Sequence, residues 1–154
     1  MIETGELQLT AEDHEKAFTE VSFLLEIFAD TITDLMGGAT ATVGRIAGRH
    51  IAEKLPFYLP NPTTEAVLEA LVQHMRDGYQ ITYTCDPEGA DLTFGHCAIC
   101  DVCRARNQEL GGDLCKMFHY SIGGIVNQLM DKPVKGSIEK TGDTCVSRLT
   151  IRSE

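Results

Sequence analysis

The sequence predicts an α+β domain in which N-terminal helices precede a β-β-α-β-β unit with an antiparallel sheet. Up to Met75, apolar residues recur every three or four positions, which is the period of an amphipathic helix. At Tyr79 the pattern changes to strict alternation, which is typical of a half-buried strand. A chain of 154 residues is long enough to bury a core without disulfides. We therefore expect one domain over residues 1–154, with a loose lead-in over residues 1–12.

The first predicted helix runs from Asp13 to Met36 and ends at Gly37-Gly38. Leu24 and Ile27 widen its apolar stripe, so the helix should be covered on two sides. Such a stripe is explained by intramolecular core or by the seam of a homodimer. Its predicted face consists of Phe18, Val21, Leu25, Phe28, Ile32 and Leu35.

Two shorter helices should follow, over residues 40–54 and from Thr63 or Thr64 to Arg76. Small residues in the first of these, above all Gly44-x3-Gly48, predict a close approach of another backbone. The nearby Arg45, Arg49 and His50 are expected to be solvated.

Four strands are expected around one long helix. Tyr79, Ile81 and Tyr83 alternate with polar residues, and a second strand delivers the chain to Cys97 after a turn at residues 86–89. The cysteine segment that follows is predicted to be a loop. Asp113 can cap the long helix, whose buried face includes Phe118 and Ile122. The last two strands should cover residues 134–140 and 144–152.

Charge and hydropathy exclude several classes of function. The formal net charge is −10, whereas a nucleic-acid binder needs clustered positive charge, so we expect no direct contact with nucleic acid. No apolar run is long enough to cross a bilayer, and no secretion signal is apparent, so we expect no membrane contact. The expected compartment is the reducing cytoplasm, where clustered thiols bind metal more often than they pair.

Four of the six cysteines lie close together, at Cys97, Cys100, Cys103 and Cys115. Thiolates are soft metal ligands, and two intervening residues let neighbouring sulfurs face one ion. Cys115 falls in the first turn of the long helix, where backbone N–H groups stabilise a thiolate. Cys145 shares an inward strand face with Leu149 and should meet Cys115 if the helix packs on the sheet. The pattern predicts a metal site.

The order of these parts is similar to a known family. The run Cys115-Lys116-Met117-Phe118-His119-Tyr120-Ser121-Ile122-Gly123-Gly124, followed by Gly142-Asp143-Thr144-Cys145, resembles the 4-vinyl reductase domain. That family comprises small hydrocarbon-binding proteins, including ligand-sensing domains of aromatic-responsive bacterial activators. Its fold is like that of trafficking-complex subunits of the TRAPP type. The likeness is clearest from Tyr79 to the C-terminus.

The resemblance implies a dimer with an apolar ligand pocket, for which Phe118, Ile122, Gly123 and Gly124 are candidate residues. Gly123-Gly124 itself indicates either close backbone packing or space kept beside the helix. In aromatic-sensing members, zinc is held by cysteines that correspond to Cys115 and Cys145. The two ligands between them match poorly, since this strand offers only Glu139, followed by Lys140.

We expect Cys97, Cys100 and Cys103 to supply the metal ligands that the strand lacks. The set of Cys100, Cys103, Cys115 and Cys145 suits zinc, whereas Cys97, Cys100, Cys103 and Cys115 resemble an iron–sulfur arrangement. His96, His119 and Glu139 are reserve ligands.

Three functions follow from these patterns. The first is a non-enzymatic sensor that binds a small apolar molecule, carries a structural metal and signals to a regulatory protein partner. The second is an iron–sulfur redox or gas sensor. The third is an enzyme related to tetrapyrrole vinyl reductases, as the family name suggests. We place the enzyme last because the sequence has no Gly-rich nucleotide loop and no defensible catalytic arrangement.

Overall fold

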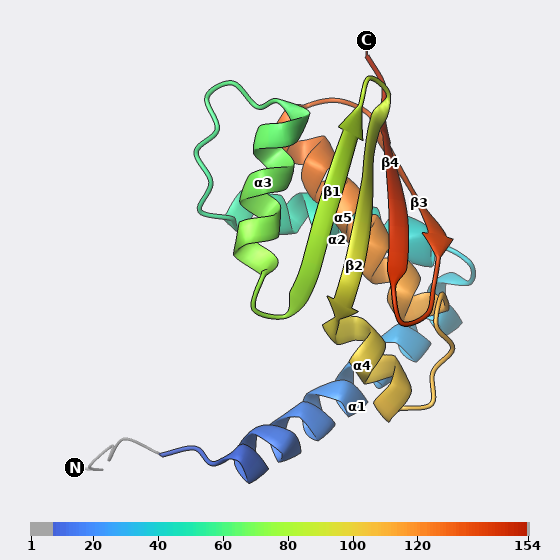
Figure 1. Cartoon of the computed structure of the whole chain (residues 1–154). Coiled ribbons are helices and arrows are strands. Elements are labelled where there is room, and N and C mark those ends of the chain that lie inside the picture. The colour runs from blue at the N-terminus through green and yellow to red at the C-terminus, as the bar shows by residue number, and fades with distance from the viewer. Residues whose placement is uncertain (1–7, 154) are drawn as a thin grey trace, which may run out of the picture.

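A computed structural model describes residues 8–153 and shows five helices and four strands in that range (Figure 1). The predicted α+β class, with helices first and an antiparallel sheet after them, is confirmed. In chain order the elements are α1 (Ala11–Met36), α2 (Thr40–Lys54), α3 (Thr64–Met75), β1 (Tyr79–Asp86), β2 (Gly89–Cys97), α4 (Ala98–Ala105), α5 (Asp113–Met130), β3 (Val134–Lys140) and β4 (Cys145–Ile151).

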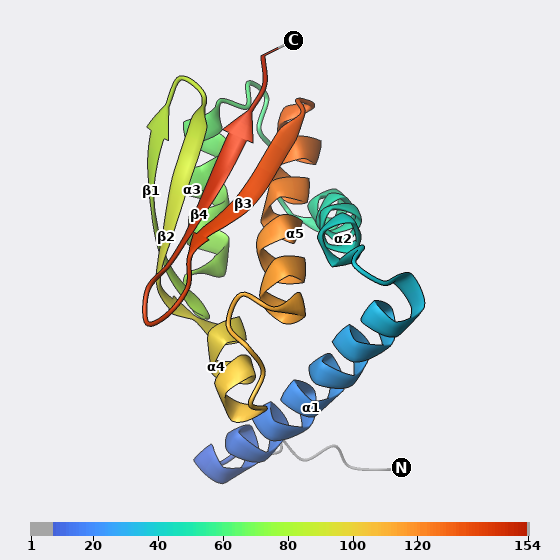
Figure 2. The same cartoon turned by 90° about the vertical axis from the view of Figure 1, so that its right-hand side faces the viewer.

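The strands form one sheet in the order β1-β2-β4-β3, and every neighbouring pair is antiparallel. Seen edge-on, the sheet carries α3 and α5 on one face, and α2 lies outside α5 as a further layer (Figure 2). Helices α1 and α4 lie at one end of this stack, next to the start of α5. Alternation in β1 places Ile81 inward and Gln80 and Thr82 outward, as its sequence predicts.

The interior lies between the sheet and the helices α3 and α5. Its largest fully buried side chains come from α3, β2, α5 and β4, and they include Leu68, Leu92, Phe94, Ile122 and Leu149. Burying one such side chain stabilises the fold by roughly 1.5–3 kcal/mol, so this layer supplies much of the stability.

Helix α1 begins at Ala11, earlier than the predicted Asp13. Thr10 accepts a hydrogen bond from the backbone N–H of Asp13, and the Asp13 carboxylate accepts one from the backbone of Thr10. This capping box fixes the first turn, so the expected lead-in over residues 1–12 is two residues too long. Residues 1–7 of that lead-in lie outside the described range.

The cysteine segment after β2 is the helix α4, so its prediction as a loop is wrong. A spacing of three places Cys100 and Cys103 on one face of a helix as readily as in a turn. Val102 is buried with them, while Asp101 and Arg104 lie nearer the solvent. The short amphipathic pattern is therefore a helix that turns its sulfurs inward.

Glycines let α2 and α5 cross in backbone contact. A Cβ atom at Gly48 would lie 1.9 Å from the carbonyl oxygen of Ser121, and one at Gly44 would lie 2.6 Å from that of Met117. From the other side, a Cβ atom at Gly124 would lie 2.1 Å from the carbonyl oxygen of Arg45. The close approach predicted for Gly44-x3-Gly48 is present, and Gly124 serves the same packing.

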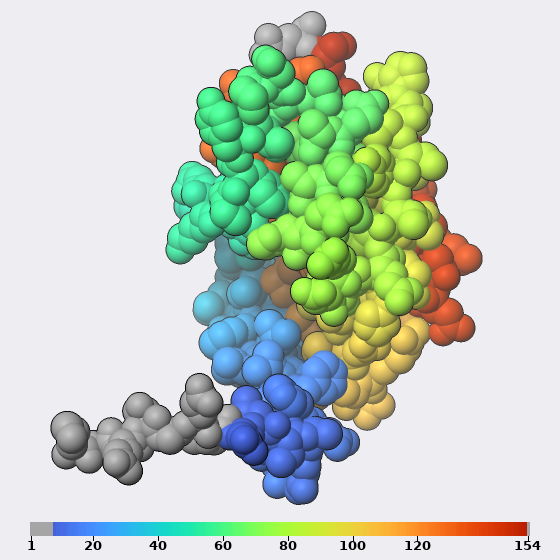
Figure 3. All heavy atoms as spheres, turned by 60° about the vertical axis from the view of Figure 1, so that its left-hand side comes forward, coloured from blue at the N-terminus to red at the C-terminus, as the bar shows by residue number. Residues whose placement is uncertain are grey.

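Helix α1 has an apolar stripe that the rest of the chain leaves exposed. It meets the body through small residues, since Ser22 and Ala29 are its buried positions. Glu26 accepts hydrogen bonds from Arg106 and Gln108 beyond α4. The first turns of α1 stand out from the body (Figure 3). Exposed by 41–80% are Phe18, Val21, Phe23, Leu24, Ile27, Phe28, Leu35 and Met36.

Candidate functional site

Five of the six cysteines are buried where α4, the start of α5 and the start of β4 meet. Cys97 is the last residue of β2, Cys100 and Cys103 lie on α4, Cys115 lies in the first turn of α5 and Cys145 opens β4. None of these five residues is more than 5% exposed. Cys85 on β1 is only partly buried and belongs to a different part of the sheet.

The sulfurs of four cysteines form two pairs. The Sγ atoms of Cys100 and Cys145 are 3.7 Å apart, and those of Cys103 and Cys115 are 3.9 Å apart. Zinc–thiolate bonds of about 2.3 Å place the sulfurs of a tetrahedral site about 3.8 Å apart. Each pair therefore has the separation of one edge of such a tetrahedron.

The pairing differs from the expected one. Cys145 meets Cys100 on α4, whereas Cys115 meets Cys103, because α4 lies between the start of α5 and the start of β4. Within residues 8–153, no three His, Cys, Asp or Glu side chains converge as the ligands of one metal ion.

Burial and mutual hydrogen bonding alter the acidity of these thiols. The hydrogen bond between the sulfurs of Cys103 and Cys115 raises the pKa of Cys103 and lowers the pKa of Cys115. Burial raises the pKa of Cys100 and also that of Cys97, with Cys97 adding repulsion at Cys100. Compared with Cys97, Cys100 and Cys103, Cys115 therefore carries negative charge more readily, as its place in the first turn of a helix predicts.

The reserve ligands lie elsewhere. The Nε2 atom of His96 is 3.1 Å from an oxygen of Asp101, at the surface. Glu139 is exposed and accepts a hydrogen bond of 2.6 Å from Ser137. His119 is buried in the interior and pairs with Ser147.

His119 and Ser147 form a buried polar pair within an otherwise apolar layer. The Nδ1 atom of His119 is 2.6 Å from Oγ of Ser147, and both residues are 3% exposed. The ring of Phe94 lies edge-on to the imidazole at 4.9 Å, and that of Phe118 at 5.1 Å. Burial lowers the pKa of His119 to about 4, so the imidazole is neutral at pH 7.

Sequence reasoning did not identify Ser147. The signal was present, because Ser147 lies two residues from both Cys145 and Leu149 and so faces inward with them. A hydroxyl on that face needs a buried partner, and His119 on α5 supplies it.

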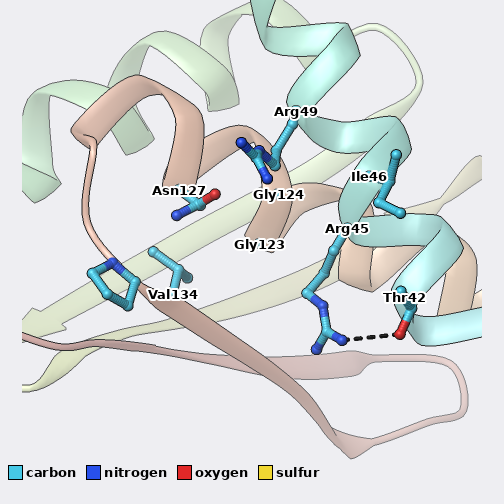
Figure 4. A pocket seen from close by; sticks show the side chains of 9 residues that line it. Thr42, Arg45, Ile46, Arg49, Gly123, Gly124, Asn127 and Val134 are labelled. Atoms are coloured by element: carbon cyan, nitrogen blue, oxygen red, sulfur yellow. Dashed lines mark hydrogen bonds between the residues drawn. The ribbon is translucent and has the colours of Figure 1, made fainter.

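The four residues predicted for a ligand pocket divide into two groups. Phe118 stacks on Tyr79 at 4.9 Å and Ile122 is 2% exposed, so both belong to the layer between α5 and the sheet. Gly123 and Gly124 instead line a cleft of about 310 Å³ at the crossing of α2 and α5, next to the start of β3 (Figure 4).

None of the helices within residues 8–153 combines the length and the apolar character that a membrane crossing requires.

No protein-family model matches the sequence, and no curated protein matches it either. In fold, the chain is similar to the phenol-responsive sensory domain of the transcription activator PoxR, solved as a crystal structure with phenol. The likeness covers 87% of this chain and 74% of the other, with a TM-score of 0.59 and 13% sequence identity. This likeness shows the α+β fold that the two chains share.

Proposed function

We propose that this protein is a ligand-binding sensor domain for a small apolar, aromatic molecule and that it signals to a regulatory protein partner. The observation that carries the proposal is the fold shared with a sensory domain crystallised with phenol, over most of both chains. The family resemblance of residues 115–145 to the 4-vinyl reductase domain supports the same function and stays a prediction.

The proposed binding region is the aromatic layer around His119. Phe94, Phe118 and Tyr79 offer ring faces and edges, and His119 with Ser147 offers the polar contact that would orient a hydroxyl group. Tyr79 and Phe118 are partly buried and stack at the margin of this layer. Movement of these two rings would give a small ring access to His119.

Calorimetric titration with phenol and with toluene tests this proposal. We expect saturable binding of phenol, with toluene at least fivefold weaker because a hydrogen bond contributes about 1 kcal/mol. The variant Ser147→Ala should weaken phenol and leave toluene unchanged. His50→Gln, on the exposed face of α2, is the control and should bind both as the wild type does. Failure of wild-type protein to bind either compound at millimolar concentration would contradict the proposal.

We also propose that Cys100, Cys103, Cys115 and Cys145 hold one structural zinc ion. Support comes from the donor chemistry, four buried thiols in two pairs whose separations equal tetrahedral edges. A bound zinc would join α4, α5 and β4, since these three elements supply the ligands. Binding would need the two pairs to come together and would stabilise the thiolate forms.

Elemental analysis of protein purified without air tests the metal. We expect one zinc per chain, no visible absorption, and loss of both zinc and stability in Cys103→Ser. Cys85→Ser, away from the cluster, is the control. Iron with a brown colour would identify the iron–sulfur alternative instead, and metal-free protein of unchanged stability would refute both.

The exposed stripe of α1 supports a homodimer. Contiguous apolar surface of this kind marks interaction sites more often than free solvent-facing surface. A charged pair of substitutions, Leu24→Glu with Phe28→Glu, should halve the mass measured by light scattering. Thr19→Glu, on an exposed polar position of the same helix, should leave the mass unchanged. Wild-type protein that is monomeric at 100-fold dilution and at high concentration alike would disprove the dimer.

A further inference from the structure

A second candidate site lies between α2, α5 and the start of β3, away from His119. It is the cleft of about 310 Å³ at the helix crossing, a volume at the lower end of small-molecule sites. Gly123 and Gly124 are buried there, where Gly124 is in backbone contact with α2 and Gly123 faces β3 and Leu149. The lining also includes Thr42, Arg45, Ile46, Arg49, Asn127, Pro133 and Val134.

Two arginines give this cleft positive charge. Arg45 and Arg49 are one helical turn apart on α2. Figure 4 shows Arg45 reaching toward Thr42 and Arg49 reaching toward Gly124 and Asn127, at the other end of the cleft. Among residues 8–153, the salt bridges to carboxylates come from other basic residues and leave both guanidinium groups without an acidic partner. Their internal partners are neutral: Arg45 donates to Thr42 at 3.1 Å, and Arg49 to Gln128 at 3.5 Å.

Arg45 and Arg49 belong to a chain whose formal net charge is −10. Carboxylates are plentiful on this protein, yet among the described residues none lies within ion-pair distance of either arginine. Arg45 is half-buried, unlike the solvated side chain that its sequence context predicts. A guanidinium has five N–H donors, and most of those of Arg45 and Arg49 are available to a ligand.

The rest of the lining is mixed, with Thr42 and Asn127 polar and the other side chains apolar. Ile46 is 49% exposed, and Pro133 and Val134 line the cleft at the start of β3. Asn127 donates to the carbonyl of Lys132, which leaves its side-chain oxygen free to accept. A ligand that fits these surfaces has an anionic head for the arginines and a small apolar body for the other wall.

We propose that this cleft binds a small carboxylate with an apolar body, of the size of benzoate. Arg49 binds the carboxylate by charge-assisted hydrogen bonds at the Asn127 end of the cleft, Arg45 adds positive charge from the Thr42 end, and Ile46, Pro133 and Val134 cover the ring. The site is separate from the aromatic layer around His119, and the inference does not rest on the proposed function.

Chemical-shift titration of the labelled protein with benzoate tests the site, with benzamide, acetate and inorganic phosphate as comparison ligands. We expect benzoate to shift resonances of α2 and of residues 123–134, and to bind at least tenfold more tightly than the other three. The double variant Arg45→Gln with Arg49→Gln should bind benzoate at least tenfold more weakly. Arg76→Gln, on an arginine at the end of α3, should bind it as the wild type does.

Either of two results would overturn the proposal. Equal affinity for benzoate in the wild type and the double variant would remove the arginines from the site. Equal affinity for benzoate, acetate and phosphate would show that only an oxyanion is recognised and that the apolar wall plays no part. Because phenol binding is measured on the same samples, failure here is distinguishable from failure of the proposed sensor function.

Discussion

The buried imidazole of His119 should make the fold sensitive to mild acid. Its pKa is about 4 in the folded chain and about 6.5 when unfolded, so the unfolded state binds more protons between these values. Stability is therefore fully present above pH 6.5 and falls as the pH decreases towards 4. Between pH 7 and pH 5, the loss attributable to this residue is about 2 kcal/mol.

Urea denaturation at pH 7, 6 and 5 of the wild type and of His119→Gln measures this effect. Glutamine can still bond to Ser147 but does not titrate, and subtracting the two free energies of unfolding cancels the pH dependence of the many carboxylates. We expect the variant to be less stable at pH 7 and the difference to shrink by about 2 kcal/mol at pH 5. A difference that stays constant across the three pH values would refute the burial of a neutral imidazole. Leu9→Ala, an exposed position without a titrating group, should show such a constant difference.

Three further predictions concern the scaffold. Gly48→Ala places a methyl group against the carbonyl of Ser121 and should lower the free energy of unfolding, measured in urea, by about 1–3 kcal/mol. Gly38→Ala is the control and should leave that free energy unchanged, because no atom lies within 4 Å of its Cβ. Leu68→Ala removes a side chain with no exposed area and should lower the free energy of unfolding by about 2–5 kcal/mol. Leu9→Ala, at an exposed position, should change it negligibly, and equal effects of the two substitutions would contradict the core assignment. The bidentate hydrogen bonds from Arg148 lower the pKa of Asp86 to about 2. Arg148→Ala should therefore raise the pKa of Asp86 towards its ordinary value, as measured by an NMR titration of the carboxyl groups. An unchanged pKa would disprove the pairing.

Periodicity predicts most of the helices and strands, because burial of one face leaves a direct trace in the sequence. The bounds of α2 and β3 agree with the expected ones, and those of the other strands differ by one or two residues at some ends. The segment at Cys100 and Cys103 was misjudged because Cys-x2-Cys suits a metal-binding turn and a helix face equally. Only the packing of this segment beside α5 decides between them.

The partners within a site are harder to predict than its members. Spacing and alternation select five cysteines as metal ligands; all five are buried, and their metal stays a prediction. Which sulfur meets which depends on how α4 sits between α5 and β4, a tertiary arrangement with no local signature. The same holds for Arg45, which lines one cleft with the start of β3 because α2 crosses α5 at that point.

The strand order β1-β2-β4-β3 has a consequence for synthesis of the chain. The hairpin of β1 and β2 leaves the ribosome about fifty residues before β4, the strand that pairs with the other side of β2. Until then β2 is an open edge, able to pair with a strand of another chain. The nascent protein therefore passes through a stage prone to aggregation, which ends only when the last hairpin docks.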